Sequence, residues 1–198
     1  MSEEGVDLGK RRFLIAATSV VGAAGAVAVA IPFISYMLPS ARARAAGAPV
    51  EADISKLEPG QLIRVQWRGQ PVWILKRTEQ MLKDLESLVD SLNDPNSDVE
   101  DQQPSYAKNK YRSIKPEILV AIGICTHLGC SPTYRPEVAP EDLGPEWKGG
   151  FFCPCHGSRF DLAGRVYKGV PAQLNLKIPP HRYLSDSVIL VGEDEGVS

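Results

Sequence analysis

CTHLGC at residues 125–130 and CPCHGS at residues 153–158 are the two short stretches that decide the fold, and 22 residues separate them. Each stretch places a cysteine and a histidine close together, Cys125 with His127 and Cys153 with His156, and adds one further cysteine. Two thiolates and two imidazoles are a complete tetrahedral ligand set for zinc. A zinc site would leave the two further cysteines without a role, so a second interpretation is needed.

The same ligand types also match a [2Fe-2S] cluster with two thiolates on one iron and two imidazoles on the other, the arrangement of a Rieske centre. The two motifs resemble those of the Rieske iron-sulfur subunit of the cytochrome bc complex, ubiquinol:cytochrome c reductase, in its bacterial form, and the resemblance covers nearly the full chain. It implies one cluster per chain, with the metal ligands Cys125, His127, Cys153 and His156. Cys130 and Cys155 are then surplus and are expected to form a disulfide between the loops.

Such a ligand set has an electronic consequence. Two ferric ions, two sulfides and two thiolates carry no net charge when the histidines are neutral, whereas four thiolates leave an oxidised cluster at minus two. Adding an electron to a neutral cluster is easier, and Rieske centres have potentials of about −150 to +300 mV, against about −400 mV for plant-type clusters. The predicted centre is therefore suited to accept electrons from a quinol.

The resemblance implies a reaction and roles for single residues. The chain would be the electron-transfer subunit of a quinol-oxidising respiratory or photosynthetic membrane complex, and it would not be catalytic alone. The catalytic candidate is His156, which would hydrogen-bond the quinol hydroxyl and take its proton while the electron goes on to a c-type cytochrome. Ser158 would bind the cofactor by donating to a bridging sulfide, and Leu128 would dock the tip at the quinol site on cytochrome b.

The implied partners are a cytochrome b subunit, a membrane-bound c-type cytochrome and quinol, within a dimeric complex. The formal net charge of −2 argues against a nucleic-acid partner. Two other classes with Rieske centres stay open: the electron-transfer subunit of a periplasmic molybdenum oxidase such as arsenite oxidase, and an oxygenase component. An oxygenase would need a mononuclear iron site and a longer chain.

Two positions depart from the pattern of the resembled family. Many members have a tyrosine two residues after the motif serine, where its hydroxyl donates to a ligand cysteine, but this chain has Phe160. Residues 169–174 resemble the proline-rich loop that shields the cluster, although the sequence GVPAQL differs from the commoner Gly-Pro-Ala-Pro form. The missing hydroxyl predicts a lower potential than that of relatives with tyrosine.

The N-terminal region predicts export and anchoring. Arg11 and Arg12 precede an uncharged run from Phe13 to Ala41, which exceeds the roughly 20 residues needed to cross a bilayer. A twin arginine before an apolar segment is typical of the export signal for folded proteins. We expect the segment to be retained, although Ala41-Arg42-Ala43 resembles a cleavage site. The subunit would then be a single-pass protein of the bacterial inner membrane, with a cytoplasmic N-terminus and a periplasmic head.

Four parts follow from these patterns: a tail with the signal at residues 1–12, a transmembrane anchor at 13–39, a flexible hinge at 40–48 and a Rieske head at 49–198. The head is predicted to be mainly antiparallel β with one inserted helix. Alternating apolar residues predict a hairpin that turns at Gly69, and helical spacing predicts a helix over 78–92. Runs at 118–124 and 149–152 lead into the two loops, 161–165 is a hairpin turn, and 187–191 is a closing strand.

Two further segments are predicted to carry no chemistry. Residues 93–110 are rich in Asn, Asp, Gln and Ser and are expected to form a surface loop. The third histidine, His181, lies between Pro179-Pro180 and Arg182 and is expected to be a solvated surface residue.

Overall fold

The computed structural model describes residues 5, 7–41, 43 and 47–194, and the chain divides into two compact units at residues 1–45 and 46–198. The first unit contains the helix α1, Leu8–Met37. Asp7 caps it by accepting hydrogen bonds from the backbone N–H groups of Gly9 and Lys10. The helix thus begins ahead of the predicted anchor at 13–39. Part of the predicted hinge, residues 42 and 44–46, and part of the predicted tail lie outside the described residues.

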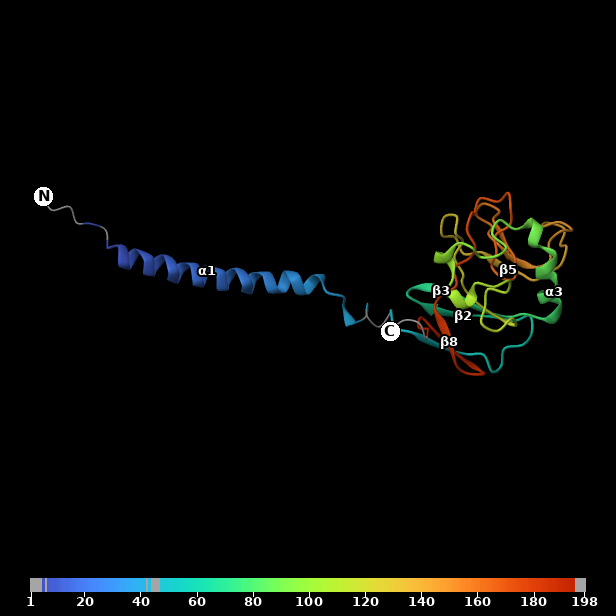
Figure 1. Cartoon of the computed structure of the whole chain (residues 1–198), viewed down its shortest axis with the longest axis horizontal. Helices are drawn as coiled ribbons and strands as arrows, with labels where there is room; N and C mark the ends of the chain where they lie inside the picture. The colour runs from blue at the N-terminus through green and yellow to red at the C-terminus, as the bar shows by residue number, and fades with distance from the viewer. Residues whose placement is uncertain (1–4, 6, 42, 44–46, 195–198) are drawn as a thin grey trace. The chain divides into compact units, whose positions relative to one another are not determined.

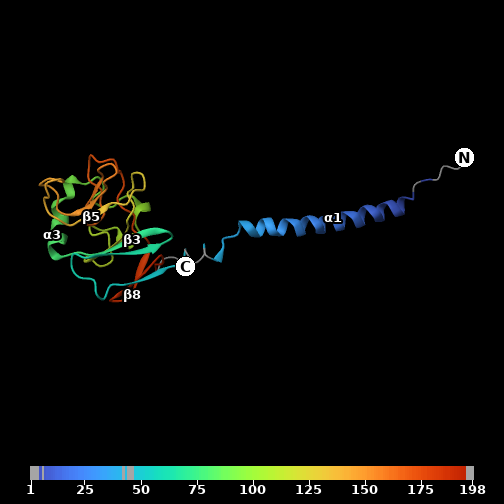
Figure 2. The ribbon, with the colours of Figure 1, turned by 180° about the vertical axis from the view of Figure 1, so that it is seen from behind.

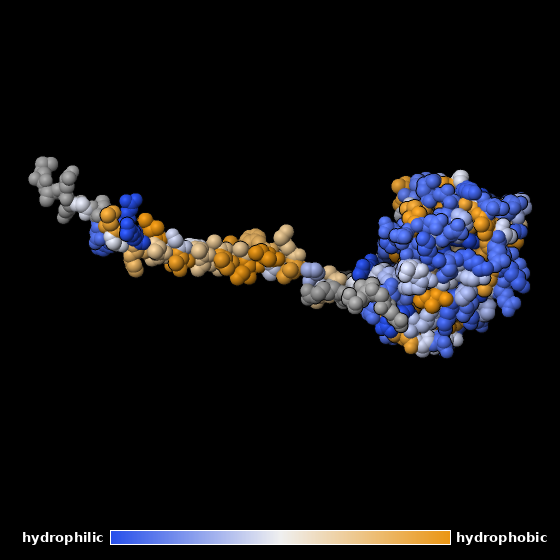
Figure 3. Space-filling view, in the orientation of Figure 1, coloured by the Kyte–Doolittle hydropathy of each residue, from blue (hydrophilic) through white to orange (hydrophobic). Residues whose placement is uncertain are grey.

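The helix α1 is apolar over most of its length, as the colours of Figure 3 show, and none of its described residues is buried. Its 30 residues make it long enough and apolar enough to cross a membrane. Pro32 lies inside the helix.

The second unit is the head, and within residues 47–194 it contains three antiparallel sheets of three strands (Figure 1). The base sheet has the order β1-β9-β8, with β1 Val50–Asp53, β8 His181–Ser185 and β9 Val188–Val191. The central sheet has the order β2-β3-β4, with β2 Leu62–Trp67, β3 Gln70–Lys76 and β4 Ile118–Ile122. The third sheet has the order β5-β6-β7, with β5 Thr133–Arg135, β6 Gly150–Phe152 and β7 Arg159–Phe160.

The predicted hairpin is confirmed as β2 and β3, paired from Leu62–Leu75 to Trp67–Gln70. Its two turn residues, Arg68 and Gly69, both have positive φ angles of 50° and 73°, the backbone shape that matches the twist of paired strands. The Arg68 guanidinium lies 4.6 Å from the centre of the Trp67 ring. A two-residue turn of this kind fixes the register of the β2–β3 hairpin.

The central sheet separates two hydrophobic cores, because successive side chains of a strand point to opposite faces. Trp73, Leu75, Leu119 and Ala121 belong to the core that also contains Cys125 and Cys153. The alternate residues of β3 and β4 belong to the second core, together with Ile189 and Val191 of the base sheet. Figures 1 and 2 show the central strands β2 and β3 between β8 and β5 from both sides. The central sheet is therefore buried on both faces, and the core on one face contains the first cysteine of each motif loop.

The predicted helix over 78–92 is shorter than expected. The helix α3 spans Glu79–Ser87, and the chain continues as a 3-10 turn, η1 Val89–Ser91. Thr78 caps α3 by accepting a hydrogen bond from the Met81 backbone N–H at 3.2 Å. Leu85, Leu88 and Leu92 are buried, so the apolar spacing is core packing, as predicted.

Residues 93–110 are more than a surface loop. They contain two short 3-10 turns, η2 Glu100–Gln102 and η3 Ser105–Ala107, and they bury Ser97, Gln103 and Ala107. The Gln103 side chain accepts a hydrogen bond from the buried guanidinium of Arg112 at 2.9 Å. The polar composition of this segment therefore serves internal hydrogen bonds as well as the surface.

The prediction for His181 is wrong, because its side chain is only 1% exposed. His181 opens β8, its backbone N–H donates to the Tyr106 hydroxyl at 2.8 Å, and its Nδ1 lies 2.9 Å from the Pro179 carbonyl oxygen. Burial lowers the pKa of His181, which keeps the ring neutral at physiological pH. The Pro180 carbonyl accepts a hydrogen bond from the Gly192 N–H at 2.7 Å, which holds this segment to the end of β9.

Candidate metal centre

The two motif loops fold in the same way. In the first loop the Cys125 N–H donates to the Cys130 carbonyl at 2.7 Å and the Gly129 N–H donates to the Cys125 carbonyl at 3.0 Å. In the second loop the same positions repeat the pattern: the Cys153 N–H donates to the Ser158 carbonyl at 2.8 Å, and the Gly157 N–H donates to the Cys153 carbonyl at 2.9 Å. The two motifs are therefore one structural unit used twice.

A glycine at the fifth position makes this turn possible. Gly129 and Gly157 have φ angles of 82° and 77°, in the left-handed region that only glycine adopts without strain. Each turn begins at the end of a strand, since β4 ends three residues before Cys125 and β6 ends at the residue before Cys153. The strands hold the first cysteine of each loop inside the head, and the turn carries the histidine outward.

The structure brings the predicted ligand residues together in two layers. Cys125 and Cys153 are both buried, free of disulfides and in contact with each other. The rings of His127 and His156 meet edge to face with centroids 4.8 Å apart, His127 half-buried and His156 exposed. Two inner thiols thus face two outer imidazoles across the same pair of turns.

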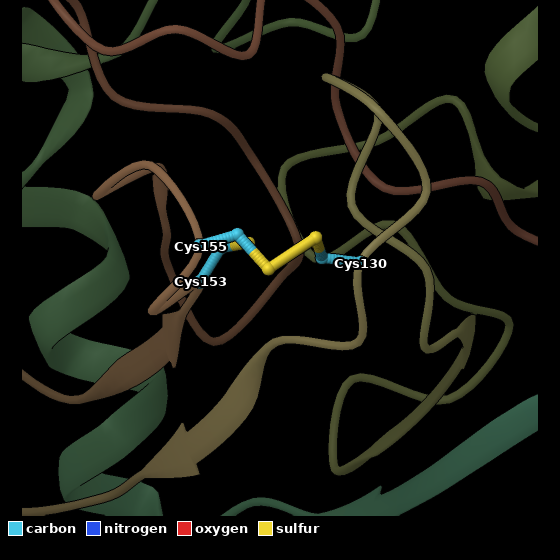
Figure 4. Close-up of side chains that lie close together, drawn as sticks. All are labelled: Cys130, Cys153 and Cys155. Carbon is cyan, nitrogen blue, oxygen red and sulfur yellow. A yellow bond between two sulfur atoms is a disulfide. The ribbon is translucent and has the colours of Figure 1, made fainter.

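The predicted disulfide between Cys130 and Cys155 is present in the structure (Figure 4), with the Cα atoms 6.7 Å apart. The sulfur atoms of Cys130, Cys153 and Cys155 lie within 4.8 Å of one another, and Figure 4 shows Cys153 beside the disulfide. Because two of these sulfurs bind each other, Cys153 and Cys125 are the thiols that remain for a metal.

The environment of the two thiols favours a cationic partner. Burial raises the pKa of the Cys153 thiol, and the adjacent Cys125 thiol contributes in the same direction. Without a positive charge nearby, this thiol stays protonated at neutral pH, whereas a bound metal ion stabilises the thiolate. The donor set of two soft thiols and two imidazoles fits a Rieske-type [2Fe-2S] cluster.

The environment of Ser158 is a second observation that fits a bound [2Fe-2S] cluster. Its side chain is fully buried, and its Oγ accepts a hydrogen bond from the Ala172 N–H at 3.1 Å. Within the described residues, the Ser158 hydroxyl proton has no protein acceptor, although a buried donor is costly to leave unpaired. A sulfur atom of a bound cluster would supply that acceptor.

The segment at 169–174 covers the loops, as its resemblance to the shielding loop predicts. Besides the contact of Ala172 with Ser158, the Thr126 hydroxyl donates to the Leu174 carbonyl at 2.6 Å. The segment at 169–174 thus forms one hydrogen bond with the first motif loop and one with the second. Thr126 was not among the predicted site residues, and its position between two ligand candidates was the only sequence signal for this contact.

Two family models match the chain. A model described as the Rieske [2Fe-2S] domain matches residues 93–180, and one described as the ubiquitinol-cytochrome c reductase Fe-S subunit TAT signal matches residues 1–40. The ubiquinol-cytochrome c reductase iron-sulfur subunit of Allochromatium vinosum is 67% identical over 196 residues, covering 99% of this chain and 94% of the relative. This chain belongs to that family. The family model at residues 1–40 also confirms the predicted twin-arginine signal.

A second relative agrees with this assignment to the Rieske subunit family. The corresponding protein of Blastochloris viridis is 43% identical over 194 residues, covering 96% of this chain and 97% of the relative. Among solved structures, a chain of a hyperthermophilic respiratory complex III has a TM-score of 0.48 and 25% identity, covering 87% of this chain and 96% of that chain. The Rieske domain makes the cofactor a [2Fe-2S] cluster rather than a single zinc ion.

Phe160 of this Rieske subunit is fully buried in the core that contains both free cysteines. Phe160→Tyr is expected to raise the midpoint potential by about 40 mV, because a hydroxyl that donates to a thiolate stabilises the reduced, more negative cluster. The size of this shift in potential follows from two values. A hydrogen bond contributes about 1 kcal/mol, and a tenfold change in the equilibrium constant of a one-electron reduction corresponds to about 59 mV. A redox titration of the purified full chain, followed by EPR, measures it.

Phe151→Tyr is the matched control, since Phe151 is another fully buried phenyl ring of the same core and stacks on Trp73 at 4.8 Å. It should leave the potential unchanged. A Phe160→Tyr midpoint that stays or falls, in protein with a full complement of iron, would show that position 160 does not face a ligand sulfur.

Proposed function

We propose that this subunit takes one electron from a quinol and passes it to a c-type cytochrome, within a respiratory or photosynthetic complex that also contains a cytochrome b subunit. The main structural support for this proposal is the pair of equivalent turns, which place two thiols inside the head and two imidazoles outside. The names of the relatives, ubiquinol-cytochrome c reductase iron-sulfur subunits, support the same reaction. The complex is proposed to be dimeric.

Each of the four ligand candidates has a role in this proposal. Cys125 and Cys153 hold one iron, and His127 and His156 hold the other. When bound, the cluster supplies reversible one-electron chemistry at a comparatively high potential. Ser158 donates its hydroxyl proton toward the cluster from its buried position.

His156 is proposed as the residue that contacts quinol. An imidazole that binds a metal through one ring nitrogen keeps its other nitrogen for a hydrogen bond. His156 is the more exposed of the two histidines, so its outer nitrogen is open to the quinol hydroxyl. This nitrogen receives the proton of that hydroxyl when the metal-bound ring carries no proton there, because a neutral metal-bound imidazole already has an N–H at this position. The second electron of the quinol leaves by another route, which belongs to the cytochrome b subunit.

The N-terminal unit is proposed to anchor the head. A twin-arginine signal exports proteins that have already folded, as a protein with a cofactor inserted in the cytosol requires. Retention of α1 as a single-pass helix then places the N-terminus in the cytoplasm and the head in the periplasm. Residues 40–48 would form the flexible hinge that lets the head reach two partners.

The molybdenum-oxidase alternative is not favoured. Identity of 67% over 99% of the chain joins it to the iron-sulfur subunit of a ubiquinol-cytochrome c reductase from the N-terminal signal to the end of the head. The oxygenase alternative would also require a mononuclear iron site.

Leu128→Asp tests the docking part of the proposal. Leu128 is 72% exposed between His127 and Gly129, so its apolar side chain has no internal packing role. A carboxylate at this position would have to be desolvated against an apolar surface of cytochrome b, which costs several kcal/mol. We expect quinol-dependent reduction of the c haem by the purified complex to fall by more than about tenfold, with an unchanged EPR spectrum of the cluster.

Val138→Asp is the control, because Val138 is also largely exposed but lies in the loop between β5 and β6. Its turnover should match that of the wild type. Equal turnover of the two variants would contradict docking through Leu128, and a wild-type complex whose cluster is not reduced by quinol would contradict the proposed function as a whole.

A further inference from the structure

A small cleft opens beside His156, and its walls are basic. The cleft has a volume of about 340 Å³ and lies between the second motif loop and residues 167–171. Arg159 and Lys168 line it, together with Tyr167, and none of the described residues on its wall is a carboxylate. Burial raises the pKa of Tyr167, so this phenol keeps its proton and adds no negative charge.

The two cations of the cleft are held by backbone oxygens alone. The Arg159 Nη1 donates to the Leu143 carbonyl at 3.4 Å, and the Lys168 Nζ donates to the Asp90 carbonyl at 2.8 Å. Neither forms an ion pair with a carboxylate in the described part of the chain. Both side chains are therefore positioned by the fold while their charges remain uncompensated.

The nearby acidic groups do not neutralise the cleft. Asp142, the neighbour of Leu143, binds Arg135 through both carboxylate oxygens at 2.8 and 2.9 Å. Asp90 offers Lys168 its backbone oxygen rather than its side chain. The head as a whole is acidic, with 17 Lys and Arg against 21 Asp and Glu in residues 49–198, so this local excess of positive charge is a feature of the cleft.

We propose that Arg159 and Lys168 bind a surface carboxylate of the c-type cytochrome that receives the electron from this subunit. A planar guanidinium with a neighbouring ammonium group is suited to hold a carboxylate by charge-assisted hydrogen bonds. The proposal rests on the proposed function, in which the electron passes to a c-type cytochrome from a cluster held partly by His156, the exposed ligand candidate that lines the cleft. It adds the chemistry by which the acceptor is recognised at that point.

The place of the cleft favours a side chain of a protein partner over a free ligand. The cleft adjoins the exposed motif loop, where a partner protein would cover it on docking. A carboxylate so placed would be held beside the imidazole and would fix the orientation of the two proteins.

The test is the rate of electron transfer from the reduced full chain, in detergent, to the oxidised c-type cytochrome subunit of the same complex, measured by rapid mixing at several ionic strengths. Arg159→Gln combined with Lys168→Gln is expected to slow haem reduction about tenfold at low salt and to flatten its dependence on salt. Lys168→Gln alone, at an exposed side chain, should give a smaller effect of the same kind.

Arg64→Gln combined with Lys83→Gln is the matched control, because it removes the same charge from two exposed residues of β2 and α3. It should keep the wild-type rate. The inference is overturned if the cleft variants match this control in rate and salt dependence. If phosphate slows the wild-type reaction more than chloride of equal ionic strength and spares the cleft variants, the inference is supported, since phosphate would compete with the carboxylate for the two cations.

This design separates the inference from the proposed function. If the reduced wild-type chain does not reduce the c haem at all, the proposed function fails and the cleft has no such partner. If the wild type transfers electrons and the cleft variants do so equally well, only the assignment of Arg159 and Lys168 fails.

Discussion

Asp161→Asn is expected to destabilise the head by about 3–5 kcal/mol, because it breaks a fully buried ion pair and leaves uncompensated charge in the core. The Arg165 Nε lies 2.7 Å from the Asp161 Oδ2, and both side chains are inaccessible to solvent. The other carboxylate oxygen accepts hydrogen bonds from the backbone N–H groups of Ala163 and Arg165 at 2.9 and 2.8 Å. One carboxylate thus closes the turn at 161–165 that follows the second motif loop.

Two further buried arginines depend on the same carboxylate. Burial lowers the pKa of Arg77 and of Arg112 to about 10, and the charge of Asp161 acts in the opposite direction on both. Arg112 donates to the carbonyl oxygens of Ala163, Gly164 and Leu176, so it joins this turn to the chain just after the segment at 169–174. Removing the Asp161 charge would leave three buried guanidinium groups without their shared counter-ion.

The measurement is the melting temperature of the purified full chain, followed by circular dichroism and by the visible absorbance of the cluster. For a domain of this size, 1 kcal/mol corresponds to about 2–4 °C, so Asp161→Asn should lower the melting temperature by about 6–20 °C. Asp186→Asn is the control, because Asp186 pairs with Lys115 at 3.0 Å at the exposed surface, where such pairs contribute at most about 1 kcal/mol. Equal melting of the two variants would contradict the role of Asp161 as a shared counter-ion.

The parts of this fold that the sequence predicts are those with local causes. The β2–β3 hairpin follows from strict alternation and a two-residue turn, and the two motif loops follow from short repeated spacings of cysteine, histidine and glycine. The glycine at the fifth position of both motifs was visible in the sequence and identifies the shared turn, although the prediction used only the metal-binding residue types. The candidate site was therefore predicted from these motifs together with the family resemblance that they carry.

The parts that were missed depend on contacts between distant segments. The base sheet pairs Val50 with Val191, and no short-range pattern reports such a pairing. His181 was predicted to be exposed because its neighbours are prolines and an arginine, but it is buried in contact with Tyr106, 75 residues away. The buried arginines were missed for the same reason, since an arginine in a sequence is far more often exposed.

The ligand assignment remains a prediction that the geometry supports and that chemical analysis can decide. The two turns place Cys125 and Cys153 inside and the two histidines outside, and this arrangement leaves Cys130 and Cys155 to each other. The disulfide therefore has a role that is separate from metal binding: it joins the outer ends of two loops that are held by different strands. Removing it should weaken the site without removing a ligand.

Cys130→Ser and Cys155→Ser are each expected to cost about 3–4 kcal/mol of stability, the chain-entropy value for a cross-link across a separation of 25 residues. Disulfides persist in exported proteins, so the bond is present under working conditions. Iron content per chain and the temperature at which the cluster absorbance is lost would be measured on the full chain. We expect near-normal iron content at low temperature and loss of the cluster at a clearly lower temperature than in the wild type.

The double variant decides between the loss of the cross-link and a side effect of the single changes. In Cys130→Ser the freed thiol of Cys155 belongs to a group of sulfurs within 4.8 Å of one another that includes Cys153, so it can compete for iron. The double variant has no free thiol at either position, and like each single variant it lacks the Cys130–Cys155 disulfide. If the cross-link is what stabilises the loops, the two changes are strongly non-additive and all three variants lose the cluster at about the same temperature. Additive effects would instead assign the stability to each cysteine separately, and a single variant that equals the wild type would show that the two turns hold the loops together without the disulfide.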